Sequence, residues 1–207
     1  IVRKTAELRP EHGTPPDKRL LRRRECEFEI FRSVEEAIEL PMIKAGFTTL
    51  DDFISRAQTV LQRRKARSGR SLELHTREIL IEERFREGAD FEHGPQSEPG
   101  KRPDFLFPSQ AAYRDPSFPA ARLRMLATKT TCRDRWRQVL NEADRIQVKH
   151  LLTLQEGVSE AQFREMTQAN VQLVVPEPLI GKFPASIRED IQALESFMGD
   201  LRLIVPA

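Results

Sequence analysis

Two short apolar runs constrain the fold of this chain most strongly, because each has one ionisable residue at an end. Asp104 immediately precedes the run at residues 105–107, and Lys129 stands at the end of the strand whose apolar run is at residues 123–127. Runs of this length and composition are typical of buried β-strands. A carboxylate and an amine at the tips of two buried strands can meet beside a divalent metal ion. The sequence therefore predicts a reactive edge where these two strands end.

The remaining apolar pattern predicts an α/β fold. The second run is followed by a helix, a strand, a helix, a strand and a last helix, expected at residues 134–146, 148–154, 159–169, 171–175 and from 184–186 to 201. Strands that alternate with helices in this way form a mixed central sheet with helices on both faces. We therefore expect a single α/β core with the site at one edge of its sheet.

The N-terminal third is predicted to be helical and separate from this core. Prolines and a glycine in the first segment favour an arm or linker without regular structure at residues 1–19. Apolar residues at helical spacing then predict a small helical lobe at residues 20–70, ahead of the core at residues 71–207.

Proline, glycine and capping residues set the expected helix ends in this lobe. Pro41 is expected to end the first helix, and Thr48 or Thr49 to cap the second. Gly69 is expected to stop that second helix, so that Ser71 starts a new amphipathic helix belonging to the core.

Composition bounds the class of protein. A chain of 207 residues with 39% apolar composition can bury one core of useful size. Its two cysteines, Cys26 and Cys132, lie far apart and lack the paired spacing of a zinc site, which favours a reducing compartment. No apolar run approaches the ~20 residues of a membrane helix. We therefore expect a cytoplasmic protein that is not bound to a membrane.

Charge is unevenly distributed although the net charge is only +2. Basic residues gather in three blocks at residues 18–24, 63–70 and 133–137. Any one block is equally well explained as a solvated helix face. Three blocks around one predicted site favour a basic groove for a polyanion such as the phosphates of DNA.

Longer stretches of the sequence also resemble the motifs of a known family. Pro103-Asp104 followed by a downstream Lys129 is similar to the signature of the PD-(D/E)XK nuclease superfamily. Four words at residues 103–108, 125–138, 141–144 and 154–158 resemble, in the right order, the catalytic domain of the EcoRII-type restriction endonucleases. The resemblance covers the chain from about residue 70 to its C-terminus.

The resemblance implies a nuclease that hydrolyses double-stranded DNA with Mg²⁺ and leaves 5′-phosphate ends. The superfamily has an acid two residues before the lysine, where this chain has Ala127. Glu142, thirteen residues after Lys129 on a predicted helix, is the candidate for the missing carboxylate. Asp104 and Glu142 would then hold the metal ion together with the main-chain carbonyl of Thr128.

Two further catalytic roles follow from the resemblance. Lys129 would orient or deprotonate the attacking water and offset charge on the phosphate. Glu73, in the word Leu72-Glu-Leu-His75, would join the acidic cluster from the start of the preceding helix. A glutamate in the first turn of a helix is equally well explained by the helix dipole.

Base reading is assigned to the tripeptide after the catalytic lysine. Arg133 and Arg135 can pair bidentately with guanine, and Asp134 can accept from the cytosine amino group. In the family this tripeptide reads a CC:GG step, with a lysine where Arg133 stands. The resemblance implies a CCWGG site with flipped central bases, read by a homodimer. Arg32, beside Phe31, is the candidate for the flipped-base pocket.

Two alternatives stay open at this point. Ala127 alone would permit a DNA-binding module whose nuclease site has decayed. Tyr113, the single tyrosine, lies near arginines and would permit strand transfer through a covalent intermediate without metal. A Glu142 that reaches Asp104 favours the metal-dependent enzyme, whereas a Glu142 in solvent or in a salt bridge favours decay.

The resemblance also raises an expectation about the segment before Ile1. Enzymes of the EcoRII type carry an N-terminal effector domain that blocks the catalytic cleft, and no stretch of this chain has the length or β-rich composition of such a domain. We therefore expect the catalytic part alone, with residues 1–19 as the linker to a preceding effector domain.

Overall fold

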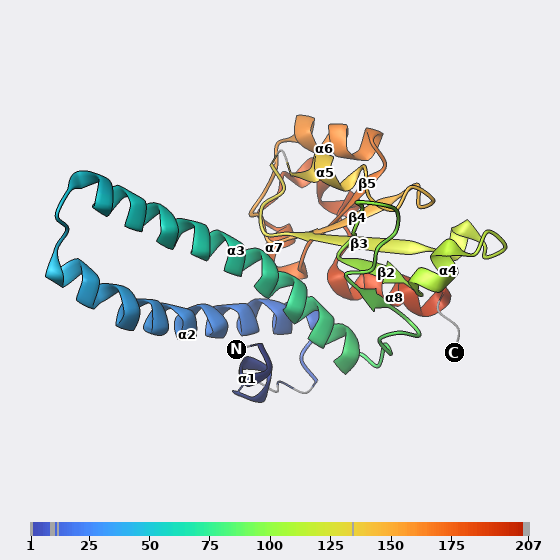
Figure 1. Cartoon of the computed structure of the whole chain (residues 1–207). Coiled ribbons are helices and arrows are strands. Elements are labelled where there is room, and N and C mark those ends of the chain that lie inside the picture. Colours follow the sequence, from blue (N-terminus) through green and yellow to red (C-terminus); the bar gives the residue numbers. More distant parts are fainter. Residues whose placement is uncertain (1, 9–10, 12, 134, 205–207) are drawn as a thin grey trace.

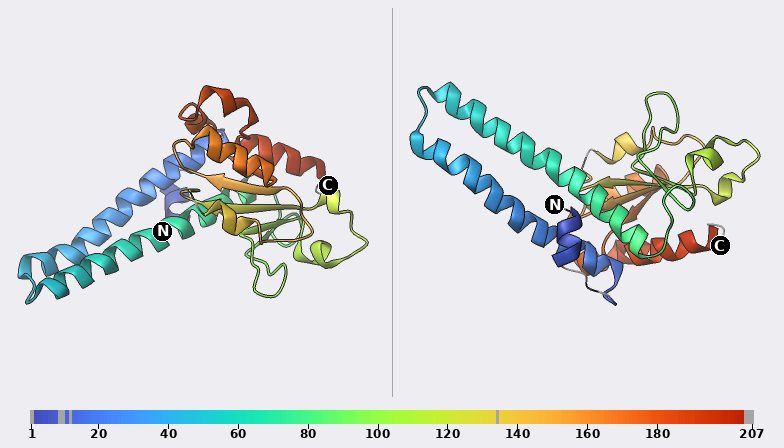
Figure 2. Two further views of the ribbon diagram at one scale, coloured as in Figure 1. Left: turned by 90° about the horizontal axis from the view of Figure 1, so that it is seen from above. Right: turned by 60° about the horizontal axis from the view of Figure 1, so that its bottom comes forward.

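The computed structural model describes residues 2–8, 11, 13–133 and 135–204. A long helical hairpin projects from an α/β core (Figures 1 and 2). Helix α1 (Val2–Leu8) lies against the base of the hairpin, which is formed by α2 (Pro16–Ala45) and α3 (Leu50–Glu82). The expectation of an arm without regular structure at residues 1–19 is wrong, because α1 and the first turn of α2 lie in that segment.

The core is built on one five-stranded sheet in sequential order. Its strands are β1 (Glu92–His93), β2 (Phe105–Phe107), β3 (Arg124–Lys129), β4 (Lys149–Thr153) and β5 (Val171–Val174). Strands β1, β2 and β3 pair antiparallel, whereas β3, β4 and β5 pair parallel. The predicted mixed α/β sheet is confirmed, and it has β1 as an additional short strand that was not predicted.

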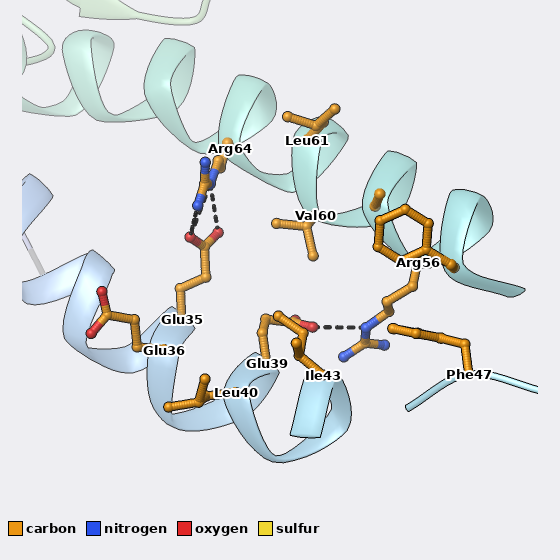
Figure 3. A pocket seen from close by; sticks show the side chains of 12 residues that line it. Glu35, Glu36, Glu39, Leu40, Ile43, Phe47, Arg56, Val60, Leu61 and Arg64 are labelled. Carbon is orange, nitrogen blue, oxygen red and sulfur yellow. Dashed lines mark hydrogen bonds and ion pairs between the residues drawn. The ribbon is translucent and has the colours of Figure 1, made fainter. Parts of the chain in front are cut away.

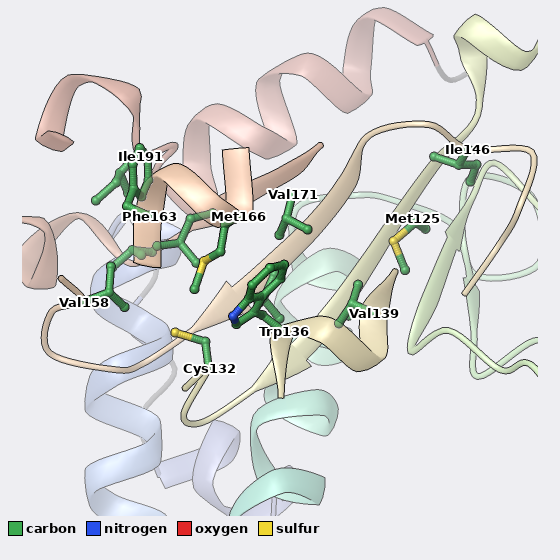
Figure 4. Close-up of a cluster of buried hydrophobic side chains, with 14 of the residues drawn as sticks. Met125, Cys132, Trp136, Val139, Ile146, Val158, Phe163, Met166, Val171 and Ile191 are labelled. Carbon is green, nitrogen blue, oxygen red and sulfur yellow. The ribbon is translucent and has the colours of Figure 1, made fainter. Parts of the chain in front are cut away.

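One face of the sheet is covered by α5 (Trp136–Val139) and α6 (Glu160–Gln168), which make the crossovers between parallel strands. Trp136, Val139, Phe163 and Met166 are buried there against strand residues (Figure 4). Alternate strand residues point to the opposite face, where the inner part of α3 and helix α8 (Leu194–Ile204) pack. Helices therefore pack on both faces of the sheet.

Two predicted helices of the core have different bounds in the structure, and further short helices were not predicted. The helix expected at residues 134–146 is only the four-residue α5, so Glu142 lies in the turn after it and not on a helix. The last helix is divided into a 3₁₀ segment (Ala185–Asp190) and α8. The excursion after β2 contains α4 (Gln110–Arg114) and a 3₁₀ turn (Ala120–Arg122), and α7 (Glu177–Ile180) follows β5.

The hairpin helices pass through the residues expected to end them. Pro41 lies inside α2, and Gly69 and Ser71 lie inside α3, so one helix crosses the expected boundary between lobe and core. A proline this close to the helix end removes one late hydrogen bond, and a mid-helix glycine costs only about 1 kcal/mol. Packing beyond both points outweighs these costs. The Thr49 cap is confirmed, with Asp52 completing a capping box.

Ion pairs join α2 to α3 along the length of the hairpin. From the tip inward, the pairs are Glu39 with Arg56 and Arg63, Glu35 with Arg64, Glu27 with Arg67, Arg23 with Glu82, and Arg19 with Glu82 and Glu83. Because their acids are mostly buried between the helices, these pairs act at lower dielectric than surface pairs do.

The base of the hairpin is tied to the core by one buried carboxylate. Asp17, in the first turn of α2, accepts hydrogen bonds from the backbone N–H groups of Glu177, Leu194 and Glu195 at 2.8 to 2.9 Å. These donors open α7 and α8, where unpaired N–H groups and the helix dipole favour an anion.

Among the described residues, no helix is both long and apolar enough to cross a membrane.

Glu27 is the most strongly perturbed acid of the hairpin. It is 3% exposed and accepts hydrogen bonds from the Arg67 guanidinium at 2.7 Å and from the Ser71 hydroxyl, with His75 at 3.6 Å. Burial raises the pKa of Glu27, but the neighbouring His75, Ser71 and Arg67 outweigh it and hold the pKa at about 2. Folding is therefore favoured above the ordinary pKa of 4.5, and this contribution is lost as the pH falls toward 2.

Replacing Glu27 should test this contribution. We expect Glu27→Gln to lower the free energy of unfolding by roughly 1 to 3 kcal/mol at neutral pH, because a buried network loses its charge. The difference should shrink as the pH falls below about 4.5. Denaturant unfolding across this range is the measurement, with the exposed Glu29→Gln as the matched control on the same helix. An equal loss at every pH would contradict the assignment.

Candidate active site

Asp104 and Lys129 meet at one end of the paired strands β2 and β3. The Asp104 Oδ2 atom accepts hydrogen bonds from the Thr128 backbone N–H at 2.6 Å and from its hydroxyl at 2.9 Å. The Lys129 Nζ atom lies 3.8 Å from the same oxygen. Both side chains are about one-fifth exposed, so solvent can reach them. The structure thus brings together the two residues that the strand tips predicted.

Ala127, which stands where the nuclease superfamily has an acid, lies opposite Asp104 in the sheet. Phe105 pairs with Leu126, and continuing this register places Asp104 opposite Ala127. Ala127 is buried in the cluster beneath α5 and leaves no carboxylate at this point of β3. A second acid must therefore come from outside the two strands.

Glu142 supplies a carboxylate within the electrostatic reach of this pair. Its Oε2 atom is buried and has no hydrogen-bond partner among the described residues. Burial raises the pKa of Glu142 to about 7, with the Lys129 charge lowering it, the Asp104 charge raising it and the Lys149 charge lowering it. The Oε2 atom of Glu142 therefore has no described partner and lies within the electrostatic influence of both Asp104 and Lys129.

The turn that carries Glu142 is held by cations that bind its backbone. Lys149, buried on β4, donates to the carbonyls of Ala143, at 2.6 Å, and Ile146. Arg145 donates to carbonyls of the α4 segment, including that of Asp115 at 2.9 Å. Ala143 itself has a positive φ of 49°. These contacts fix the backbone on which Glu142 is presented.

Glu73 and Tyr113 have partners outside this centre. Glu73 accepts from the His93 ring at 2.6 Å and from Arg70 at 2.5 Å, and burial opposes these two partners, which lower its pKa. The His93 ring stacks on Phe105 with centroids 5.2 Å apart. Glu73 is thus linked through His93 to the residue that follows Asp104 on β2.

Tyr113 is part of the support beneath the Glu142 turn. Its hydroxyl donates to Glu98 and accepts from the Arg145 N–H, and the same Glu98 accepts from the Asp144 N–H. Burial and Glu98 raise the pKa of Tyr113. A buried phenol with a raised pKa that is engaged as both donor and acceptor is a poor nucleophile and a good structural anchor.

The predicted base-reading segment borders a basic groove. Arg135 lines a hollow of about 860 Å³ between the hairpin and the end of β3, together with Arg24, Lys65 and Arg67. Arg133 is exposed, and its backbone is held by Gln155 and Gln162. Asp134 lies outside the described residues. The basic blocks at residues 18–24, 63–70 and 133–137 thus converge on one groove beside Lys129.

Arg32 is directed away from this groove. It pairs with Glu36 on the solvent side of α2 and is 60% exposed. The neighbouring Phe31 is buried, with the Arg67 guanidinium 4.1 Å from its ring centroid. Arg24 and Phe28 line the groove instead. Arg24 belongs to the predicted basic block at residues 18–24, whereas the only signal for Phe28 was its i, i+4 spacing from Arg24 on α2.

Comparison with known proteins decides the family. The sequence model of the family described as EcoRII C terminal matches residues 31–198. This chain belongs to the EcoRII C-terminal family. It is also 48% identical, over 201 residues, to the type II restriction enzyme EcoRII of Escherichia coli. That alignment covers 97% of this chain but 49% of the relative, so the chain spans about half the length of that enzyme.

Solved structures support the fold assigned to this EcoRII C-terminal chain. Two structures of metal-depleted Ecl18kI in complex with uncleaved DNA, one with modified DNA, superpose with TM-scores of 0.79 and 0.78. Each covers 99% of this chain and 77% of Ecl18kI, at 18% identity. At this identity the likeness establishes the fold, a restriction-endonuclease-like core.

The raised pKa of Glu142 predicts a dependence of stability on pH. In the absence of metal ions, stability should fall as the pH rises from about 4.5 to about 7, because the unfolded carboxyl ionises first. Glu142→Gln should therefore have a higher Tm than the wild type at about pH 8 and a similar Tm near pH 4.5. Mg²⁺ should raise the Tm of the wild type more than that of the variant.

Thermal unfolding in chelator and in Mg²⁺ measures both effects. The exposed Glu156→Gln is the matched control and should leave the pH profile and the Mg²⁺ response unchanged. A Glu142→Gln profile that follows the wild type would show that Glu142 is not the unpaired buried acid.

Proposed function

We propose that this chain is the catalytic part of a type II restriction endonuclease, which hydrolyses double-stranded DNA with Mg²⁺ at a CCWGG-like site and leaves 5′-phosphate ends. The observation that carries the proposal is the buried Oε2 atom of Glu142, which has no hydrogen-bond partner among the described residues and feels the charges of the Asp104 and Lys129 pair. The family and the likeness to EcoRII support the same activity.

The donor set fits Mg²⁺. This ion binds through one or two carboxylates and keeps several waters, and Asp104 and Glu142 provide two carboxylates with the Thr128 carbonyl as a further oxygen. No group of three or more His, Cys, Asp or Glu side chains suited to a metal occurs in the described ranges, which disfavours a zinc-type site. When bound, Mg²⁺ would acidify a water and offset charge on the phosphate.

The chain's own groups would do the rest of the work. Lys129, held close to Asp104, would place its ammonium group beside the attacked phosphate and stabilise the charge that develops there. The basic groove would bind the DNA backbone. Arg135, Arg133 and Asp134 would read base edges, and a two-fold site would be bound by a homodimer.

Two alternatives are less well supported. A decayed nuclease site is consistent with Ala127, but a decayed Glu142 would turn to solvent or a salt bridge, whereas its Oε2 atom is buried without a partner. Strand transfer by Tyr113 requires an accessible phenol, and this phenol is 3% exposed and bound to Glu98.

Substitutions of the two strand-tip residues should separate cleavage from binding. Asp104→Asn should abolish Mg²⁺-dependent cleavage of plasmid DNA but leave cognate binding within about tenfold, because a metal ligand is lost and no base contact is. Lys129→Ala should lower the cleavage rate by about 10² to 10³. The exposed Asp190→Asn is the control. Retained cleavage by Asp104→Asn would disprove the assignment.

Two basic residues of the groove should have different signatures. Arg135→Ala should weaken binding to a CCWGG duplex by roughly 1 to 3 kcal/mol more than binding to random duplex. Lys65→Ala should weaken both about equally and reduce the salt slope by about 1, as expected for a phosphate contact. Titrations with both duplexes at several salt concentrations measure this. Equal losses on both duplexes for Arg135→Ala would exclude base reading.

A further inference from the structure

The segment that carries the proposed base-reading residues is buried at both ends and exposed between them. Cys132 and Trp136 are 0% and 4% exposed and belong to the core cluster on the α5 side of the sheet (Figure 4). The Trp136 backbone N–H donates to the Cys132 carbonyl at 3.1 Å, which closes the segment into a turn. Arg133 and Arg135 are exposed. Because exposed side chains have few packed neighbours, their direction depends on the backbone that carries them.

The N–H group of Arg133 is held by Gln155. The Gln155 Oε1 atom accepts hydrogen bonds from the backbone N–H groups of Cys132 at 2.8 Å and Arg133 at 3.3 Å. The Gln155 Nε2 atom donates to the Gly157 carbonyl at 2.8 Å. An amide with N–H donors on one side and a carbonyl on the other has one favourable orientation. Both ends of the Gln155 amide are therefore fixed.

The groups that hold Gln155 belong to a rigid part of the core. Gly157 has a φ of 106°, and a Cβ atom there would lie 3.0 Å from the Lys182 carbonyl oxygen, which disfavours any other residue. The Gln155 N–H donates to the Thr153 hydroxyl at 3.2 Å. Thr153 ends β4 and pairs with Lys129 across the sheet. Gln155 thus connects the reading segment to the strand pairing that carries Lys129.

The carbonyl group of Arg133 is held by Gln162 from another element. The Gln162 Nε2 atom donates to this carbonyl at 2.8 Å. Gln162 lies in the first turn of α6, where its own N–H donates to the capping Ser159 hydroxyl at 3.1 Å. Buried Phe163 and Met166 fix α6 on the sheet. Hydrogen bonds to the peptide groups on both sides of Arg133 leave its φ and ψ little freedom.

The opposite wall of the basic groove is held by charged groups instead. Arg64 and Arg67 of α3 line the groove and form ion pairs with Glu35 and Glu27 of α2; Figure 3 shows the pair of Arg64 and Glu35. Carboxylates that held the reading segment would pair with its arginines in the same way and compete with DNA for them. Neutral amides that bind the backbone orient the segment without this competition.

We propose that Gln155 and Gln162 are positioning residues for sequence recognition. They hold the backbone of Arg133 so that the segment presents its side chains to base edges at a fixed place relative to Lys129. The inference rests on the proposed function, since it takes residues 133–135 to read bases. Each glutamine acts through the orientation of the segment, so its loss affects binding to the cognate sequence more than binding to random sequence.

The test measures the affinities of whole-chain variants for a CCWGG duplex and a random duplex, in chelator to prevent cleavage. Gln155→Leu and Gln162→Leu should each lower the ratio of the two affinities at least about fivefold, the lower end of the range for one base contact. Random-duplex affinity should stay within about twofold, because phosphate contacts remain. Gln168→Leu, the same change at an exposed position of α6, is the matched control and should leave the ratio unchanged.

Glutamate at the same two positions separates positioning from general stability. Gln155→Glu keeps an acceptor for the two N–H groups and should lower the ratio less than Gln155→Leu does. Gln162→Glu loses the donor to the Arg133 carbonyl and should lower the ratio as much as Gln162→Leu does. A purely structural role would instead lower the Tm and both affinities together. That result, with an unchanged ratio, would overturn the inference.

Arg135→Ala distinguishes failure of this inference from failure of the proposed base reading. If Arg135→Ala lowers the ratio and the two leucine variants do not, the glutamines are not positioning residues and base reading stands. If Arg135→Ala and the leucine variants all leave the ratio unchanged, base reading by this segment fails and the inference fails with it. A lower ratio in Arg135→Ala and in both leucine variants supports it.

Discussion

The unbroken course of α3 is the constraint on which the rest of the structure depends. Its outer half holds the arginines that pair with α2, and its inner half buries Leu72, Ile79 and Leu80 against the sheet. One rigid element therefore belongs to both hairpin and core. Because the end of β3 packs close to the same helix, the basic groove and the catalytic edge cannot shift independently. The hairpin therefore shares one rigid helix with the candidate site.

The sequence predicted those parts of the fold in which local pattern and burial agree. Strands with apolar runs, the Thr49 cap and the alternation of strand and helix were all readable because each depends on neighbouring residues. Helix ends at Pro41 and Gly69 were predicted wrongly, because tertiary contacts beyond them decide the outcome. The cross-helix pairs of Glu27 and Arg67 are forty residues apart, and no local pattern reveals them.

The residues of the candidate site differ in how well the sequence predicted their positions. Asp104 and Lys129 stand at strand tips, so their meeting follows from one antiparallel pairing. Glu142 was assigned by resemblance. Its position in a turn that Lys149 holds through the Ala143 carbonyl could not be predicted from the spacing of apolar residues. Phe28 was missed as a groove residue because only the hairpin brings it beside Arg135.

Stability and chemistry oppose one another at Glu142. Burying a carboxylate without a hydrogen-bond partner costs free energy, and the chain retains such a group beside the charge of Asp104. Lys149 and Arg145 make hydrogen bonds to and from this turn, which limits relief by a shift of the turn as a whole. A bound cation would remove the cost, because it pairs both carboxylates at once. If Asp104 and Glu142 hold a metal ion as proposed, the turn carries an arrangement that is unfavourable alone and that the ion would stabilise.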